Sequence, residues 1–253
     1  MRRLALATLV AGCTVAALAQ SNLPLPPLLQ NGGALSSDWR FVGFPKNQAD
    51  IPPTRFEPGT VDGEPALKVV TERSYGTWVN GWRGAAPERL QWRWRLDEPL
   101  SGGVAPANLL SKAGDDAALK VCVMFDHALD RVPFVERTLL RVARSVSGAP
   151  LPAATLCYVW DSVGAASVQG ANPYTRRVRF ISLQGRDAPL GRWANESRDV
   201  ARDFATLFAD ELPQGAQTPR ADLPPVNTVL IGADSDNTAS RSLGWVADLR
   251  WAP

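Results

Sequence analysis

Hydrophobic and polar residues alternate with a period of two along several parts of the chain, the pattern of half-buried β-strands. In LQWRWRL (90–96), two leucines and two tryptophans alternate with glutamine and arginine. The same alternation occurs over 119–125 and over 245–251, where it places Trp245, Ala247, Leu249 and Trp251 on one core face. Shorter apolar runs between Gly, Pro, Asn and Asp clusters predict further strands at 66–71, 76–82, 155–160, 177–183 and 226–233.

Two segments follow helical spacing instead. Val200, Phe204 and Phe208 recur every four residues, which predicts a helix over roughly 198–209 with Asn195 or Ser197 as N-cap. A second helix is expected over 133–146, because Pro133 suits a first helical turn. Its core face is expected to hold Leu139, Val142, Ala143 and Val146, with Arg137, Arg141 and Arg144 on another side.

Strands joined by turn signals predict an all-β fold, a two-sheet, jelly-roll-like β-sandwich with one or two packed α-helices. The chain has 253 residues. We divide it into a signal peptide (1–19), a Pro-rich lead-in (20–35) and a single β-sandwich domain (36–253). Sandwiches of this size are commonly one domain.

The first residues have the anatomy of an export signal. Arg2 and Arg3 precede an uncharged apolar run, and Ala17-Leu18-Ala19 provides small residues before a cleavage site. This predicts a periplasmic or secreted protein. Cys13 ends a lipobox-like VAGC, so a lipid anchor at Cys13 is the alternative, and membrane attachment is expected only in that case.

Composition excludes some functions. The formal net charge is +2 and basic residues form no dense block, so we expect no nucleic-acid partner. Cys122 and Cys157 lie in strand-like segments, either bridged or as two buried thiols. No Cys/His spacing suits a zinc site.

The sequence identifies no catalytic residues. His127 is the only histidine and has no triad context, so we interpret it as a surface imidazole at a sheet edge. A glycoside hydrolase needs only two carboxylates across a cleft, which leaves an Asp pair that includes Asp116 or Asp126 as an alternative.

A strand runs into oxygen donors in VLIGADSDNT (229–238). Asp234, Asp236 and Asn237 have the ligand chemistry of Ca²⁺, although the spacing is not that of an EF-hand. An Asx-type turn in which these side chains bond to the loop backbone is the alternative. We therefore treat Ca²⁺ as a possible cofactor and name no other.

Aromatic and polar residues also mix at predicted strand ends. A flat ring can stack on a sugar while carboxylates, amides and guanidinium groups bond its hydroxyls. The candidate ligand-binding residues of this kind are Trp160, Asp161, Asn172, Tyr174, Arg176, Asp115 and Asp116.

Five blocks carry a resemblance to a known family: SKAGDDAALKVCVMFDH, LCYVWDS, NPYTRRVRFISLQ, RDVARDFATLF and DSDNTASRSLGWVADLRW. In this order they resemble a bacterial family of exported proteins of unknown function, DUF3047. The resemblance covers most of 111–251 and implies no catalytic residues. Cys157 departs from the polar amide expected at its position, which speaks against a bridge typical of the family.

These observations favour a non-catalytic binding domain for a saccharide or other small polar ligand of the cell envelope, with Ca²⁺ as a possible aid. A polysaccharide hydrolase with an Asp pair is one alternative. An envelope structural or partner-binding protein is another, in which the arginine side of the 133–146 helix meets an anionic surface.

Overall fold

The protein is a two-sheet β-sandwich. The computed structural model describes residues 24–31, 33–44, 50–87, 89–147 and 151–252. The larger sheet contains β1 (Arg40–Val42), β4 (Tyr75–Asn80), β6 (Leu119–Phe125), β7 (Ala154–Trp160), β8 (Gln169–Ala171), β9 (Val178–Gln184) and β11 (Val226–Asp234). The smaller sheet contains β2 (Arg55–Val61), β3 (Glu64–Glu72), β5 (Arg89–Ser101), β10 (Ala194–Arg198) and β12 (Arg241–Ala252).

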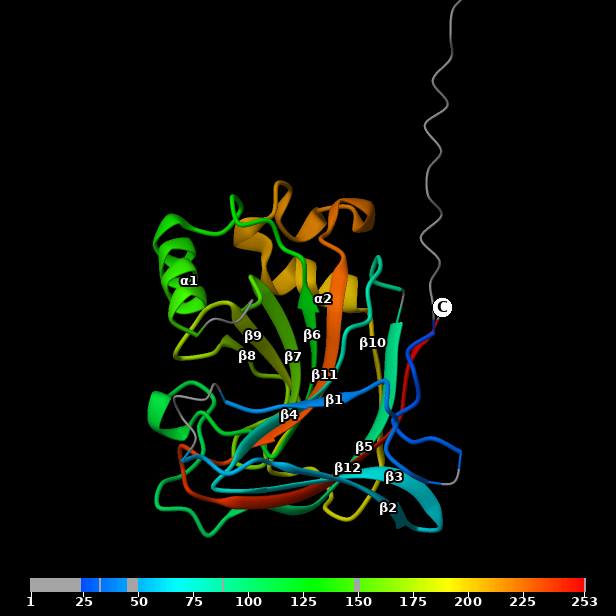
Figure 1. Ribbon diagram of the computed structural model, residues 1–253. Coiled ribbons are helices and arrows are strands. Elements are labelled where there is room, and N and C mark those ends of the chain that lie inside the picture. The colour runs from blue at the N-terminus through cyan, green and yellow to red at the C-terminus, as the bar shows by residue number, and fades with distance from the viewer. Residues whose placement is uncertain (1–23, 32, 45–49, 88, 148–150, 253) are drawn as a thin grey trace, which may run out of the picture.

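The strand orders are β1-β4-β11-β6-β7-β9-β8 and β10-β5-β12-β3-β2, and neither sheet closes into a barrel. Figure 1 shows the larger sheet above the smaller one, α1 (Phe134–Ser147) outside it near β8 and β9, and α2 (Val200–Leu207) at the top. The predicted mainly-β sandwich is therefore confirmed.

The core lies between the sheets, as the alternation predicts for β5 and β6. Trp92 and Trp94 of β5 are at most 1% exposed, and Leu119 and Val121 of β6 are fully buried. The two tryptophan rings meet edge to face, with centroids 5.5 Å apart. These rings provide much of the apolar area that stabilises the sandwich.

The four strands that the pattern did not predict, β1, β2, β8 and β10, are the edge strands of the two sheets. Edge strands are commonly short, polar or interrupted by proline, which limits pairing with other chains. β2 contains Pro58 and Gly59, and β10 reads ANESR. Without apolar alternation, such segments look like loops in the sequence.

The predicted core face of β12 is wrong at its centre. Val246 packs in the main core, whereas Trp245 and Ala247 lie in a separate cluster with Trp193. The pairing of β12 with β5 shifts between Ala247 and Arg250, where Asp248 has a φ of 55°. This irregularity shifts the alternation by one residue, so that Leu249 returns to the core.

Both helices are present, with corrections to their faces and caps. Asp199, instead of Asn195 or Ser197, caps α2, and its side chain accepts a hydrogen bond from the Arg202 amide. Asn195 and Ser197 belong to β10.

The predicted core face of α1 points to solvent. Leu139, Val142 and Val146 are 63%, 56% and 74% exposed, and Ala143 is also exposed, whereas Leu140 is buried. Polar contacts also hold the helix, because Glu136 pairs with Arg177 and the Arg144 guanidinium donates to the Leu151 carbonyl.

Part of the lead-in packs on the domain, since Leu25 and Leu28 are buried in the main core. The signal peptide and Cys13 lie outside the described residues. Within the described ranges, no helix is long and apolar enough to span a bilayer.

Candidate functional site

Three neighbouring strands bring a lysine and an aspartate together at one end of the larger sheet. Asp234, the last residue of β11, pairs in register with Tyr75, the first of β4, and Lys120 of β6 lies opposite Gly232. The Lys120 side chain crosses Gly232 to reach Asp234, with Nζ and Oδ2 2.6 Å apart. A Cβ atom at position 232 would lie 3.0 Å from Lys120 Cε, so glycine permits this close approach.

Two aspartates fix the loops around this ion pair. Asp234 accepts a hydrogen bond from the Ala117 amide at 2.9 Å. Asp116 is buried and accepts bonds from the amides of Asn237 and Thr238, at 3.2 Å and 2.7 Å. The loop before β6 and the loop after β11 are therefore tied to each other.

A third loop completes the arrangement. The Asn172 amide donates to Asp115 Oδ2 at 2.5 Å, and the Tyr174 hydroxyl donates to the Lys112 carbonyl at 2.9 Å and to Asn237 Oδ1 at 3.2 Å. The Tyr174 side chain is 57% exposed, and Lys112 Nζ lies 5.4 Å from its ring centre.

We refer to these residues, together with Asp236, as the polar cluster. Asp236 belongs with them because it lies near enough to Asp234, Asp116 and Lys120 for their charges to shift its pKa. The polar cluster comprises Tyr75, Lys112, Asp115, Asp116, Lys120, Asn172, Tyr174, Asp234, Asp236 and Asn237.

Burial and neighbouring charges raise the pKa of two carboxyl groups in the polar cluster. Burial, with the negative charge of Asp234, raises the pKa of Asp115 to about 6. The pKa of Asp236 is also raised to about 6, by burial and by Asp234 and Asp116. Burial by itself lowers the pKa of Lys120, but Asp234 outweighs it and the net shift is upward, so Lys120 stays charged. Near neutral pH, Asp115 and Asp236 thus exchange protons readily.

These shifts predict a pH-dependent stability. Because the folded-state pKa values exceed the ordinary one, protonation of Asp115 and Asp236 favours folding, and this contribution is lost as pH rises from about 4 through about 6. We expect the double variant Asp115→Asn/Asp236→Asn to gain about 1 kcal/mol per group over wild type at pH 8, after allowance for solvent screening, and nothing near pH 4. Thermal unfolding across this range measures the difference. A difference that does not change with pH would contradict it, and Asp187→Asn, at an exposed site, is the control.

Three of the predicted ligand residues lie apart from the polar cluster. Trp160 is 1% exposed and packs edge to face on Trp94, so its ring offers no face to a ligand and the expected platform does not form around it. Asp161 accepts hydrogen bonds from the amides of Val163 and Gly164, which places it in a turn. Arg176 instead pairs with Glu136 and Asp210.

The expected calcium ligands do not form a cation cage. The Lys120 ammonium group already sits on Asp234, and Asn237 Oδ1 accepts from Tyr174. In the ranges that the structure describes, no three or more His, Cys, Asp or Glu side chains converge as metal ligands. Asp234, Asp236 and Asn237 therefore do not fit Ca²⁺ in this arrangement.

Sequence reasoning missed Lys120 and Tyr75. Lys120 lies on the same face of β6 as Cys122 and Met124, the face that points away from the main core. A single lysine among apolar residues was the available signal. Its partner was not predictable, because strand order alone brings β6 beside β11.

The interpretation of His127 as a surface imidazole is wrong. Its side chain is buried, and Nε2 lies 3.1 Å from Oε2 of Glu211, which is also buried. Two arginines, Arg177 and Arg179, bond to the same carboxylate. This ion network joins η3 (Ala209–Glu211), a short 3-10 helix that follows α2, to β9, and its four members are almost completely buried.

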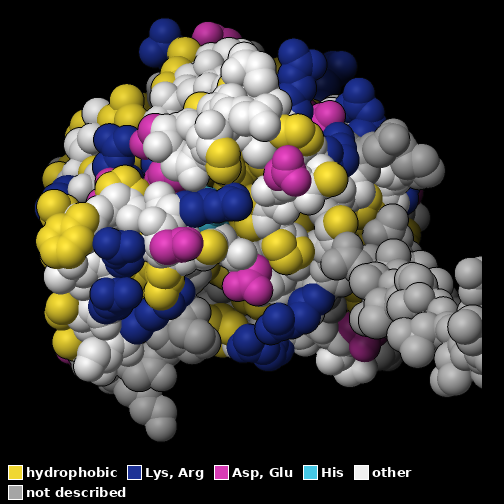
Figure 2. All heavy atoms as spheres, turned by 90° about the horizontal axis from the view of Figure 1, so that it is seen from above, with side chains coloured by type: hydrophobic (Ala, Val, Ile, Leu, Met, Phe, Trp, Pro, Cys, Tyr) yellow, Lys and Arg dark blue, Asp and Glu magenta, His cyan; other side chains and the backbone are white. Residues whose placement is uncertain are grey.

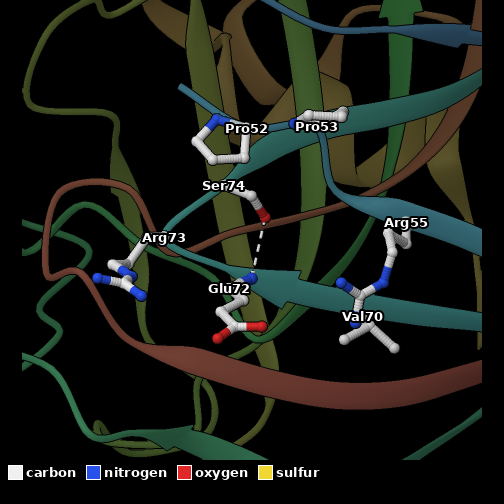
Figure 3. A pocket seen from close by; sticks show the side chains of 7 residues that line it. All are labelled: Pro52, Pro53, Arg55, Val70, Glu72, Arg73 and Ser74. Atoms are coloured by element: carbon white, nitrogen blue, oxygen red, sulfur yellow. Dashed lines mark hydrogen bonds between the residues drawn. The ribbon is translucent and has the colours of Figure 1, made fainter. Parts of the chain in front are cut away.

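A separate shallow pocket of about 270 Å³ lies near the start of β4. Figure 3 shows Pro52 and Pro53 on one side of it and Arg73, Glu72 and Arg55 on the other. The Glu72 amide donates to the Ser74 hydroxyl at 3.0 Å. Because its charged side chains are exposed and do not converge, the polar cluster remains the stronger candidate site.

Comparison with known proteins adds a family and no activity. The family model described as "Protein of unknown function (DUF3047)" matches residues 37–250, which is most of the chain. No curated protein matches the chain.

Proposed function

The chain belongs to the DUF3047 family, and we propose that it is a non-catalytic binding protein for a saccharide or similar polyhydroxylated ligand of the cell envelope. The polar cluster is the proposed site. It combines an exposed aromatic ring with carboxyl and amide groups, the mixture that saccharide sites use.

The observation that carries the proposal is that the four aspartates of the polar cluster differ in how many hydrogen bonds their carboxyl oxygens accept from the protein. Asp234 and Asp116 are bonded to the protein through both oxygens. Within the part of the chain that the structure describes, side chains donate to Asp115 only at Oδ2, and none donates to Asp236. Two half-buried carboxyl groups of the polar cluster thus keep unused hydrogen-bonding capacity. With pKa values of about 6, each can accept from a hydroxyl when ionised or donate to one when protonated.

The geometry speaks against Asp116 and Asp126 as partners in one hydrolase pair. Asp116 precedes β6 and Asp126 follows it, so the seven-residue strand separates them by about 20 Å. Paired glycosidase carboxyl groups stand about 5 to 10 Å apart. Asp116 is moreover saturated by Asn237 and Thr238.

A glycan array probed with the full chain tests the proposal. We expect selective binding, reduced about tenfold or more by Asp115→Asn/Asp236→Asn because bonds to charged groups are lost. Tyr174→Ala should also weaken it through loss of the ring. Asp187→Asn, whose carboxylate is 92% exposed, is the matched control and should bind as wild type does.

The same array with Ca²⁺ and with EDTA tests the metal. We expect equal binding in both, because Lys120 supplies the positive charge beside Asp234. Binding lost in EDTA would contradict the metal-free site. No binding to any glycan, or binding unaffected by the double variant, would overturn the proposed function, and release of reducing ends would replace it with hydrolysis.

A further inference from the structure

Helix α1 presents an apolar stripe to solvent. Val135, Leu139, Val142 and Val146 are spaced at i, i+4, i+7 and i+11, which places them on one side of the helix. Their exposed fractions run from 56% to 74%, and Phe134 at the N-terminal end is 73% exposed. Contiguous exposed apolar surface of this kind marks an interaction site more often than a free surface.

The protein holds α1 by its other side. Leu140 packs in a small cluster with Val132 and Ala153, and Glu136 bonds to Arg177 of the domain. The apolar stripe therefore points to solvent because Leu140 and Glu136, on the other side of the helix, contact the domain.

One basic side chain flanks the stripe. Arg141 is exposed next to Phe134, whereas Arg137, whose guanidinium lies 5.7 Å from the Phe134 ring, is half-buried on the side of the helix away from the stripe. The one acidic residue of α1, Glu136, is already paired with Arg176 and Arg177. Figure 2 shows hydrophobic and basic side chains next to each other along the edge of the molecule that α1 occupies in Figure 1.

We propose that α1 docks the protein on the surface of an anionic lipid bilayer. The stripe enters the boundary between headgroups and acyl chains, and Arg141 meets lipid phosphates. With 14 residues the helix is about 21 Å long, which suits a helix lying in the interface and is too short to cross the membrane.

Charge complementarity favours lipid over a second copy of this chain. A symmetric contact of two stripes would bring the Arg141 side chains of both copies to the rim of one interface, where like charges repel. An anionic surface attracts Arg141. This inference concerns a surface distinct from the polar cluster and does not depend on the proposed function.

Co-sedimentation of the full chain with lipid vesicles tests the proposal. We expect binding to vesicles that contain phosphatidylglycerol, weakened by salt, and little binding to phosphatidylcholine alone. Leu139→Ser/Val142→Ser should weaken it at least tenfold through loss of apolar burial. Arg141→Gln should weaken it about fivefold, the effect of one basic residue near an anionic surface.

Val104→Ser, at an 87% exposed apolar position outside α1, is the matched control and should leave binding unchanged. Because all these side chains are exposed, the unfolding midpoints should also stay the same. Absence of binding to phosphatidylglycerol vesicles at low salt, or equal binding by the α1 variants, would overturn the proposal. A wild-type dimer that Leu139→Ser/Val142→Ser dissociates would also overturn it, since the occupant would then be a second copy.

Discussion

Replacing Glu211 by glutamine is expected to lower the free energy of unfolding by about 3–5 kcal/mol. The Glu211 carboxylate is fully buried and accepts hydrogen bonds from Arg177 at 2.8 and 2.5 Å and from Arg179 at 2.5 Å. A neutral amide keeps the shape of the side chain but removes the charge shared by two buried guanidinium groups. Urea denaturation at neutral pH measures the loss.

The control is a similar pair at the surface. Glu64 bonds to Arg93, but its side chain is 52% exposed. Water solvates both partners there, so Glu64→Gln should cost less than about 1 kcal/mol. Equal losses in the two variants would contradict the importance that we assign to burial.

The same network predicts resistance to acid. Burial by itself raises the pKa of Glu211, but the hydrogen bonds from Arg177 and His127 outweigh it and bring the pKa down to about 2, from an ordinary 4.5. Since the folded-state pKa is the lower one, the ionised carboxylate stabilises the fold above about pH 4.5, and this contribution is lost as pH falls toward 2. The difference between wild type and Glu211→Gln should therefore shrink over that interval.

The sequence could not reveal this network because each member gives a different local signal. His127 follows a strand, Arg177 precedes β9 and Arg179 lies within it, and Glu211 lies in a loop-like segment after α2. Only the fold places them together. Burial of a charged residue also contradicts its average behaviour, so a single sequence favours the exposed interpretation.

The elements were predictable where one physical signal dominated. β5 and β6 are interior strands of their sheets, and their alternation identified the core correctly. On α1 the apolar spacing correctly predicted a helix but not its orientation. A pattern shows that two faces differ, whereas the partners decide which face is buried, and here Glu136 and Leu140 decide it.

The candidate site shows the same division. Asp115, Asn172 and Asp236 were predicted from composition at strand ends, and the structure brings them into one cluster. Trp160 had the same local signal but lies in the core. Residue type therefore identified groups suited to a polar ligand, but tertiary packing determined which of them share a surface.

Removal of the Cys122–Cys157 disulfide is expected to lower the free energy of unfolding by about 2–4 kcal/mol. The sequence left a bridge and two buried thiols open, and the structure joins the two cysteines directly across β6 and β7, where they are register partners. The bridge closes a loop over a sequence separation of 35 residues and so restricts the unfolded chain.

The double variant Cys122→Ala/Cys157→Ala measures this effect by urea denaturation, and reduction of wild-type protein should reproduce it. Both side chains are at most 5% exposed, so the variant also loses some packing, and reduction without substitution separates the two contributions. Val104→Ser, at an exposed position, leaves the bridge intact and serves as the control. If wild-type protein unfolds at the same urea concentration with and without reductant, the crosslink contributes nothing, and the pair behaves as the two buried thiols of the alternative interpretation. A lower midpoint in reductant alone would instead mean that β6 and β7, which hold the middle of the larger sheet, depend on an oxidised environment for part of their stability.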